Sequence, residues 1–330
     1  DGRGVAEFGS RRAQGAQGAI LGARAAYIGG CSSTACTLSD REYHIPASGT
    51  MAHSWVQMFP NEYEAFTAYC LLYPNNAVLL VDTYNVLKSG IPNAIKVFNE
   101  LRAEGHEPAG IRIDSGDITY LSRKARKMLD DAGFPNAKIC ISNSLDEYII
   151  EDILRQGACI DSFGVGERLI TSRSEPVFGG VYKLTAVEKD GQIIPKIKLS
   201  ENVTKITTPD FKELWRFYDK TTGKAIADLI TCYGEEVDDT KPYTIFDPEH
   251  PYKKKTVTDF TAKKLLVQIF DKGECVYESP SATEIRDFCH EQIGTLWSEV
   301  TRFENPHEYY VDLSKKLWDK KNDLLNEMSV

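Results

Sequence analysis

The sequence lacks the features that would place it in a membrane or on a nucleic acid. No apolar run approaches the roughly 20 residues that a membrane-spanning helix needs, and the polar first residues do not resemble a signal peptide. Positive charge is in the minority, with 39 Lys and Arg against 48 Asp and Glu. A broad nucleic-acid-binding surface is therefore not expected, although a few arginines in one cleft suffice for a small anion. We expect a cytoplasmic protein with no membrane or nucleic-acid partner.

A zinc-binding cysteine pattern is also missing. Cys31 and Cys36 are close in sequence, but no second pair follows at ligand spacing, so the 8 cysteines are expected to be reduced core residues. With 330 residues, 42% of them hydrophobic, the chain can bury a large core. It begins at Asp1 and residues 5–8 already have a strand pattern, so we expect it to start inside a larger protein.

The first half of the chain alternates short apolar runs with helical patterns. This alternation is typical of a parallel sheet or a barrel. Polar residues or glycines follow each apolar run, at the strand ends where α/β folds place their chemistry. In chain order, the expected strands are Ala77–Val81, Ile111–Ile113, Lys138–Ile141 and Cys159–Phe163, and the expected helices include Ser89–Arg102 and Ile118–Ala132.

The pattern changes from about Val181 onward, which indicates an appended region rather than more barrel. We therefore expect an α/β barrel domain over residues 1–200 and a C-terminal region of strands and helices over residues 201–330. The elements expected here are antiparallel strands at Val181–Val187 and Ile193–Leu199, a loop over Pro242–Tyr252, and helices over about Ala282–Val300 and Pro306–Met328.

Charged residues end one of the expected strands. Arg112 and Asp114 are two positions apart, so both side chains point to one side of an extended backbone. A cation beside a carboxylate at a strand end suits a phosphate with its magnesium ion, or a ribose diol. The structural alternative is a simple ion pair, with Asp117 capping the next helix.

Three further clusters have a functional and a structural interpretation. In Ser48–His53, glycine lets backbone amides approach an anion and His53 would stand at the mouth of a site, although a lone histidine is more often structural. Gly164–Gly166 resembles half of a dinucleotide fingerprint and suits a phosphate cradle, but a third glycine is missing. Phe8–Arg12 offers an aromatic face beside two guanidinium groups, or else a core residue beside surface charge.

Taken together, these strings resemble the nicotinate phosphoribosyltransferase family. The match is ordered and runs from Glu7 to at least Leu199. One departure is Thr34–Asp40, which differs from the sequence of many members. The matching strings are Glu7–Ala13, Gly49–Ser54, Val81–Tyr84, Ile113–Asp117, Ser142–Asn143, Phe163–Gly166 and Gly179–Leu184.

The resemblance implies an incomplete (β/α) barrel of the type II phosphoribosyltransferase kind, with an appended β-rich and helical C-terminal region. It implies an N-terminal region that this chain lacks, and a homodimer with active sites near the subunit contact. The family joins nicotinate to phosphoribosyl pyrophosphate with Mg²⁺ present, releasing pyrophosphate in NAD biosynthesis. ATP hydrolysis is coupled to transfer through a phosphohistidine, which by its motif would be His53.

The resemblance also implies roles for the other motif residues. Phe8 would stack on the pyridine ring, Arg11 would meet phosphate, and Arg112 would lie near the ring or the pyrophosphate. Asp114 would hold the ribose hydroxyls or Mg²⁺. The remaining substrate-binding positions are Thr50 in the histidine motif, a 5′-phosphate cradle of Ser142, Asn143, Gly164 and Gly166, and one of Arg168 and Arg173.

We expect Thr34 to determine the choice between nicotinate and nicotinamide. When residues are counted without gaps from Phe8, Thr34 takes the position at which nicotinamide-using relatives carry an aspartate. The charge of that aspartate would repel the carboxylate of nicotinate. Thr34 removes that repulsion and offers a hydroxyl donor, unless it only caps the following turn.

The alternatives are a nicotinamide phosphoribosyltransferase, an enzyme of quinolinate, and a non-catalytic nucleotide-binding regulatory module. None of the five histidines outside the motifs is expected to be catalytic.

Overall fold

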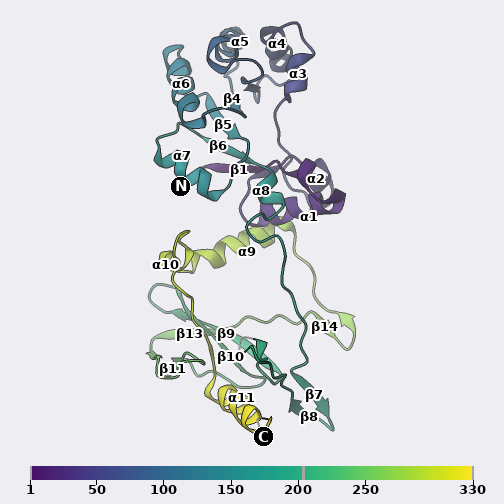
Figure 1. The fold of residues 1–330 in the computed structure, drawn as a ribbon, viewed down its shortest axis with the longest axis vertical. Helices are drawn as coiled ribbons and strands as arrows, with labels where there is room; N and C mark the ends of the chain where they lie inside the picture. Colours follow the sequence, from purple (N-terminus) through teal and green to yellow (C-terminus); the bar gives the residue numbers. More distant parts are fainter. Residues whose placement is uncertain (1, 203–204, 329–330) are drawn as a thin grey trace. The chain divides into compact units, whose positions relative to one another are not determined.

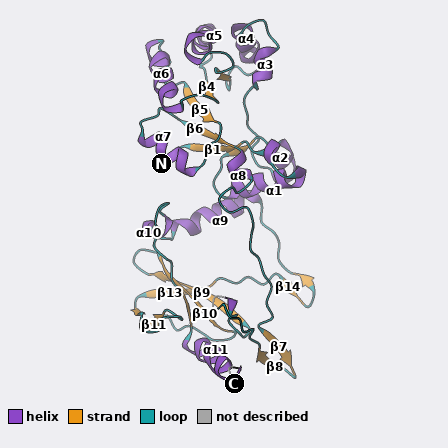
Figure 2. Cartoon of the chain, viewed as in Figure 1, coloured by secondary structure: helices purple, strands orange, loops and turns teal. Residues whose placement is uncertain are grey.

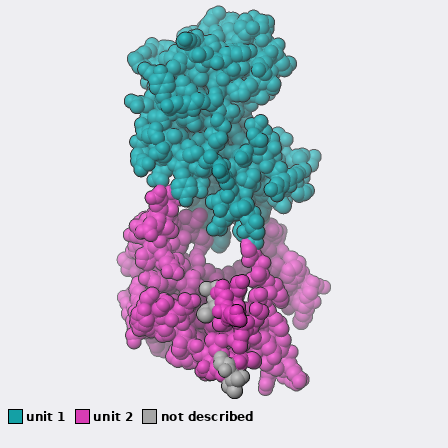
Figure 3. All heavy atoms as spheres, viewed as in Figure 1, with its two compact units in different colours: residues 1–178, 280–290 teal, residues 179–279, 291–330 magenta. Residues whose placement is uncertain are grey.

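The computed structural model describes residues 2–202 and 205–328, and it divides the chain into two compact units (Figure 3). Unit 1 comprises residues 1–178 and 280–290, and unit 2 comprises residues 179–279 and 291–330. The sequence placed a domain boundary after residue 200. The compact units instead change after residue 178, and a short later segment belongs with the first unit.

Unit 1 is built on a six-stranded sheet in the order β2-β1-β6-β5-β4-β3. Every neighbouring pair in this sheet is parallel. Five of its six strands form where the sequence predicted them, although the last begins later than expected, and the two-residue strand β2 was not predicted. The strands are β1 (Gly4–Glu7), β2 (Ser33–Thr34), β3 (Val78–Leu80), β4 (Gly110–Ile113), β5 (Lys138–Ser142) and β6 (Ser162–Val165).

The strand order identifies this sheet as an incomplete barrel. The first strand, β1, pairs with β6, as the first and last strands do when a barrel closes. The two edge strands, β2 and β3, are consecutive in sequence, and the sheet is open between them over the residues described. The predicted fold class, an incomplete α/β barrel with a β-rich appended region, is confirmed.

Helices connect the strands of unit 1 (Figure 1). Asn61, Asp117 and Asp146 cap three of them by accepting hydrogen bonds from backbone N–H groups of the first turn. The predicted helices at Ser89–Arg102 and Ile118–Ala132 are confirmed within a few residues. The helical segments are η1 (Ser10–Arg12), α1 (Gly15–Ile28), α2 (Thr37–Tyr43), α3 (His53–Gln57), α4 (Glu62–Leu72), a π-helical turn η2 (Val86–Gly90), α5 (Ile91–Ala103), α6 (Ile118–Asp131), α7 (Glu147–Arg155) and α8 (Glu167–Ile170).

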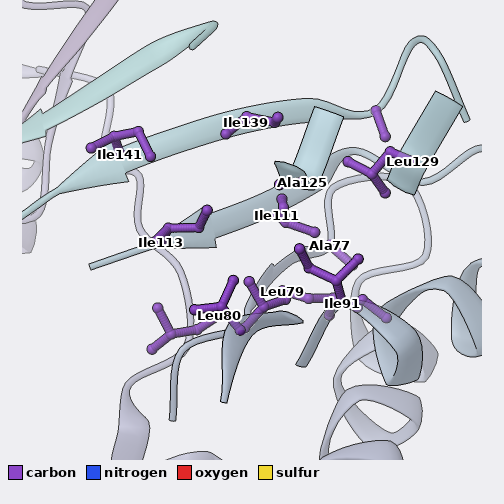
Figure 4. Close-up of a cluster of buried hydrophobic side chains, with 14 of the residues drawn as sticks. Ala77, Leu79, Leu80, Ile91, Ile111, Ile113, Ala125, Leu129, Ile139 and Ile141 are labelled. Carbon is purple, nitrogen blue, oxygen red and sulfur yellow. The ribbon is translucent and has the colours of Figure 1, made fainter. Parts of the chain in front are cut away.

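The largest apolar core lies between this sheet and its helices. Figure 4 shows Ile111 of β4 near Ile139 of β5, its partner in the strand register, with Leu129 of α6 beside them. All three side chains are fully buried, and burying each contributes about 1.5 to 3 kcal/mol. The sheet that carries the polar strand ends is thus rigidly supported.

Unit 2 contains a four-stranded sheet in the order β13-β9-β10-β16, three two-stranded sheets, and helices (Figure 2). Helix α9 contributes residues to both units. The strands are β7 (Ala186–Lys189), β8 (Gln192–Pro195), β9 (Lys212–Asp219), β10 (Ala225–Cys232), β11 (Tyr243–Phe246), β12 (Lys254–Val257), β13 (Phe260–Lys264), β14 (Phe270–Asp271), β15 (Glu274–Cys275) and β16 (Val311–Leu313), and the helices are α9 (Ala282–Gly294), α10 (Ser298–Thr301) and α11 (Lys315–Met328).

Several local predictions for this region were wrong. The antiparallel pair exists, but as β7 and β8, which are shorter than the expected strands. The predicted loop Pro242–Tyr252 contains β11, whose alternation is only four residues long. The two predicted C-terminal helices are each interrupted: the first divides into α9 and α10, and β16 occupies the start of the second.

All eight cysteines are free thiols. Burial, with the nearby charge of Glu7 for Cys31, raises the pKa of Cys31 and Cys70 to about 11, so these thiols stay protonated at neutral pH. In the described part of the chain, no helix has both the length and the apolar character needed to cross a bilayer.

Candidate active site

Arg112 is the centre of a hydrogen-bonded cluster at the carboxyl end of β4. Its Nε donates to Ser142 Oγ at 2.9 Å, Nη1 donates to Thr50 Oγ1 at 2.9 Å, and Nη2 donates to Asp114 Oδ1 at 3.1 Å. The Ser142 hydroxyl in turn donates to the same Asp114 oxygen. The Arg112 side chain is only 16% exposed, so its fixed donors hold three separate chain segments in one arrangement.

The strand register explains why these groups meet. Arg112 pairs with Cys140 on β5, and Ser142 lies two positions further along that strand, on the same face. Asp114 directly follows β4, again two positions beyond Arg112. The prediction that Arg112 and Asp114 point to one side is therefore confirmed, and parallel pairing adds Ser142.

His53 begins helix α3 and faces two carboxylates. Its Nε2 lies 3.8 Å from Asp82 Oδ1 and 3.8 Å from Asp114 Oδ2. Its Nδ1 is 3.2 Å from the Thr83 hydroxyl. The His53 side chain is 40% exposed, so one side of the ring is accessible. The other side faces Asp82 and Thr83, which follow β3 in the chain.

Asp82 is a residue of this cluster that the sequence analysis did not single out. Its Oδ2 accepts from the backbone N–H of Asp114 at 3.0 Å and from the Ser115 hydroxyl at 2.6 Å. Its Oδ1 is buried and has no hydrogen-bond partner among the described residues. The signal was available, because Val81–Tyr84 was one of the matching strings and Asp82 is the charged residue that ends an apolar run.

Phe8 lies against Arg112, with the guanidinium carbon 5.2 Å from its ring centroid. A side chain on Gly164 would overlap that ring, so this glycine makes room for Phe8. Gly166 precedes α8, where an added Cβ would lie 3.1 Å from the Phe8 carbonyl oxygen. The glycines predicted to cradle phosphate thus have a packing role beside Phe8, and their contact with phosphate stays a prediction.

Thr34 lies on the neighbouring edge strand, fully buried, and its hydroxyl is already in use. Oγ1 donates to Glu7 Oε2 at 2.6 Å and accepts from the Cys36 backbone N–H at 2.9 Å. Glu7, also fully buried, accepts through its other oxygen from Gly9 N–H. This is the turn-capping arrangement that the sequence analysis held as the alternative, so recognition of nicotinate by Thr34 itself stays a prediction.

The loop after β5 has an uncommon backbone. Asn143 and Ser144 have φ values of 85° and 52°, a left-handed conformation that side chains other than glycine rarely adopt. Such residues concentrate at functional sites. The helix that follows, α7, is capped by Asp146, which accepts from Ile149 N–H at 2.8 Å.

Three arginines were candidates for binding phosphate: Arg11, and either Arg168 or Arg173. Arg168 forms an ion pair with Asp146. Burial would raise the pKa of Asp146, but the Ile149 N–H, the Arg168 hydrogen bond, and the charges of Arg168 and Arg173 hold it below its usual range. Arg11 is exposed in η1 and is not part of the Arg112 cluster.

The residues brought together at the carboxyl ends of β3, β4 and β5 therefore combine one arginine, two carboxylates and one accessible imidazole. An aromatic ring lies beside the arginine. Such a set can bind an anionic substrate with its counter-ion, and the hydrogen bonds among its members fix their positions before a ligand arrives.

Comparison with known proteins gives this cluster a family context. Residues 4–214 match the model of the nicotinate phosphoribosyltransferase (NAPRTase) family, and residues 211–321 match the nicotinate phosphoribosyltransferase C-terminal domain. Among curated relatives, the nicotinate phosphoribosyltransferase of Bacillus subtilis (strain 168) is 44% identical over 98% of this chain and 65% of its own length. That of Dictyostelium discoideum is 33% identical over 96% of this chain and 62% of its own.

Solved structures agree with this comparison. The crystal structure of human nicotinic acid phosphoribosyltransferase superposes with a TM-score of 0.77 at 26% identity, covering 97% of this chain and 70% of the human one. A nicotinate-nucleotide pyrophosphorylase from Pyrococcus furiosus, 21% identical with a TM-score of 0.61 over 89% of this chain and 66% of its own, shares the fold. The chain spans 65% and 62% of the length of the two curated relatives above. It belongs to the nicotinate phosphoribosyltransferase family.

Proposed function

We propose that this chain carries the catalytic centre of a nicotinate phosphoribosyltransferase. The reaction forms nicotinate mononucleotide and pyrophosphate from nicotinate and phosphoribosyl pyrophosphate, as a step of NAD biosynthesis. The observation that carries this proposal is the cluster in which Arg112 joins Thr50, Asp114 and Ser142 at one sheet edge, with Phe8 against its guanidinium.

The reaction depends mainly on how the two substrates are positioned. The ring nitrogen of nicotinate has a free lone pair, so it attacks C1 of the ribose without a general base. The bond from C1 to the pyrophosphate oxygen breaks, and its electron pair leaves with pyrophosphate. Transition-state stabilisation therefore comes from groups that face the cationic ribose and the departing anion.

Each residue of the cluster fits one part of that task. Phe8 offers a face on which the pyridine ring stacks, and Arg112 supplies positive charge to the nicotinate carboxylate or the departing pyrophosphate. Asp114 faces the ribose, where its carboxylate stabilises developing positive charge and accepts from the hydroxyls. Ser142 keeps Asp114 and Arg112 in register, since it donates to one and accepts from the other.

Magnesium fits the carboxylates of this site. Asp82 Oδ1 is buried without a hydrogen-bond partner among the described residues, and Asp114 Oδ2 lies on the same side of His53. The described residues contain no group of three or more protein ligands for a metal. Mg²⁺ commonly takes one or two carboxylates and completes its shell with phosphate oxygens and water. Asp114 and Asp82 would hold the ion, which would neutralise pyrophosphate charge.

His53 is proposed to accept the γ-phosphoryl group of ATP, releasing ADP, and to couple ATP hydrolysis to transfer. Its ring is accessible on one side and oriented by Thr83, Asp82 and Asp114 on the other. A phosphoryl group on His53 adds negative charge beside these carboxylates in one part of the cycle only, and so changes pyrophosphate binding at that stage.

The 5′-phosphate is proposed to bind at the loop after β5. Asn143 and Ser144 turn their backbone through left-handed conformations there, and Arg173 adds positive charge near Asp146. We favour Arg173 over Arg168 for this contact, because Arg168 is already paired with Asp146. Arg11 is proposed to meet phosphate from an exposed position, and the active protein is proposed to be a cytoplasmic homodimer.

The proposal is tested on the full-length protein by following pyrophosphate release. We expect release to require both nicotinate and phosphoribosyl pyrophosphate and to be stimulated by ATP. Release without nicotinate, or none with both substrates, contradicts the transferase assignment and favours a binding module.

The coupling step has its own test. His53→Ala should abolish ATP hydrolysis while leaving slower, ATP-independent transfer, since the ring and ribose groups remain. His290→Ala, which changes a histidine outside the motifs, is the matched control and should behave as wild type. Full stimulation by ATP in His53→Ala would assign the coupling to another residue.

A further inference from the structure

A cavity of about 770 Å³ opens in unit 2, and no residue of the Arg112 cluster lines it. Its walls are the β11–β12 hairpin on one side and residues 307–312, which lead into β16, on the other. The volume falls within the range of about 300 to 1,000 Å³ that is typical of small-molecule sites. The cavity is thus a candidate binding site separate from the proposed catalytic centre.

Asp312 is one of the residues that line this cavity. Asp312 is 4% exposed and is in register with Leu229, a core residue, so its side chain lies on the apolar face of the sheet. The part of the chain that the structure describes gives this carboxylate no hydrogen bond and no ion pair. Burial, and then the charge of Asp247, raise its pKa to about 6. A buried acceptor without donors favours a ligand that supplies them.

Basic residues also line the cavity. Lys253 and His250 are both engaged by Asp247, at 3.6 Å and 3.2 Å. Lys254 and Lys255 on β12 also line the cavity. Successive residues of a strand extend to opposite faces, and the charge of Lys255 acts on Asp219 outside the cavity, so Lys254 is the cation available to a ligand there. The cavity therefore offers a single ligand one carboxylate without a described partner and one ammonium group that forms no ion pair with a described residue.

An aromatic residue, Tyr310, also lines the cavity, two positions before Asp312. Tyr310 is 49% exposed, and its ring is T-shaped to that of His307 with centroids 6.0 Å apart. The neighbouring Tyr309 has its hydroxyl fixed on Asp228 at 2.9 Å. The Tyr310 face is thus available for stacking on a planar base.

We propose that this cavity binds a guanine nucleotide, with the base edge on Asp312 and the phosphates at Lys254. Guanine presents the N1–H and N2–H groups as parallel donors on one edge, which matches the two oxygens of an ionised carboxylate. Adenine instead places the N1 lone pair beside its amine, and an ionised carboxylate repels that lone pair. The site would discriminate between the two purines by hydrogen bonding.

Isothermal titration calorimetry of the full-length protein tests this proposal. A non-hydrolysable ATP analogue is kept saturating, so that binding of the titrant at the proposed catalytic centre is suppressed. We expect GDP to bind saturably and at least tenfold more tightly than ADP, a difference of about 1.4 kcal/mol. In Asp312→Asn, GDP affinity should fall at least tenfold while affinity for xanthosine diphosphate rises, because xanthine presents a carbonyl that the new amide can donate to.

Two controls locate the site. Asp323→Asn changes an exposed carboxylate elsewhere and should leave GDP binding unchanged. Lys254→Ala should weaken GDP binding while keeping the preference over ADP, because the base contact is intact. Absence of saturable GDP binding at millimolar concentration, equal affinity for GDP and ADP, or unchanged GDP affinity in Asp312→Asn would overturn the proposal.

Discussion

Two aspartates in the two units show how differently one side chain can be accommodated. Asp114 at the sheet edge of unit 1 is 25% exposed and accepts from Arg112 and Ser142, with His53 beside its other oxygen. Asp312 in unit 2 is more deeply buried and has neither hydrogen bond nor ion pair among the described residues. The first is held in a fixed arrangement by its neighbours, and the second is not.

The difference has an energetic meaning. A carboxylate paired with an arginine and a hydroxyl has its charge compensated within the protein, so removing it leaves the arginine uncompensated. A largely buried carboxylate without protein donors is less well solvated than in the unfolded chain, so removing its charge relieves a cost. Neutralising the two residues should therefore have opposite effects on the protein.

Asp114→Asn is expected to give the largest effect. The amide keeps the size of the side chain but removes the charge that balances Arg112 and that we propose faces the ribose. Removing such a group costs about 2 to 4 kcal/mol in the transition state, so kcat/KM should fall by roughly two to three decades. The measurement is steady-state kinetics on the full-length protein.

Asp117→Asn is the matched control for this variant, since Asp117 only caps α6 through Tyr120 N–H and asparagine caps equally well. Its kcat/KM should stay near that of wild type. If Asp114→Asn also stays near wild type, the Arg112–Asp114 pair is only structural.

Asp312→Asn should give the next largest effect, with the opposite sign for stability. The pKa of Asp312 is raised from 3.8 to about 6 in the folded protein, so the folded state binds more protons than the unfolded chain within that window. The free energy of unfolding therefore falls as pH rises from about 4 to about 6, and the cost persists at pH 7. Because Asp312 lines a cavity in which solvent screens its charge, the amide should recover only part of this cost, about 1 to 2 kcal/mol at pH 7.

Denaturant unfolding at several pH values measures this effect. The variant should gain stability over wild type as pH rises through that window, whereas Asp323→Asn should stay within about 0.5 kcal/mol of wild type. A loss of stability in Asp312→Asn at pH 7 would mean that this carboxylate has donors in solution.

Glu7 gives an intermediate case, because its partners are neutral donors. Thr34→Val removes one of them and leaves a buried carboxylate oxygen unsatisfied, which should cost about 1 to 3 kcal/mol of folding stability. Thr34→Ser retains the hydroxyl and should lose less.

The same two variants separate the roles of Thr34. If Thr34 has no role beyond its hydrogen bond to Glu7, the ratio of kcat/KM for nicotinate to that for nicotinamide should change little in Thr34→Val. A fall of tenfold or more in that ratio would support direct recognition of the acid by Thr34.

The sequence predicted unit 1 well because its signals are local and repeated. Each buried strand is a continuous apolar run followed by a polar end, as at Ile111–Ile113 before Asp114, and parallel pairing brings these ends together. Asp82 was missed as a site residue because its importance depends on the approach of His53 from a distant segment.

Unit 2 was harder to predict for physical reasons. Short strands such as β11 and β16 carry too few residues to establish an alternating pattern, and β16 lies between stretches that look helical. Asp312 gives no sign in the sequence of being buried, because its burial follows from pairing with β10, about 80 residues earlier.

The most direct test of the proposed function is mass spectrometry of the products made by the full-length protein. Nicotinate and nicotinamide are supplied together at equal concentration with phosphoribosyl pyrophosphate, Mg²⁺ and ATP. We predict that nicotinate mononucleotide is the dominant product and that its amount falls by roughly two to three decades in Asp114→Asn. Nicotinamide mononucleotide as the main product, or no mononucleotide at all, would contradict this account.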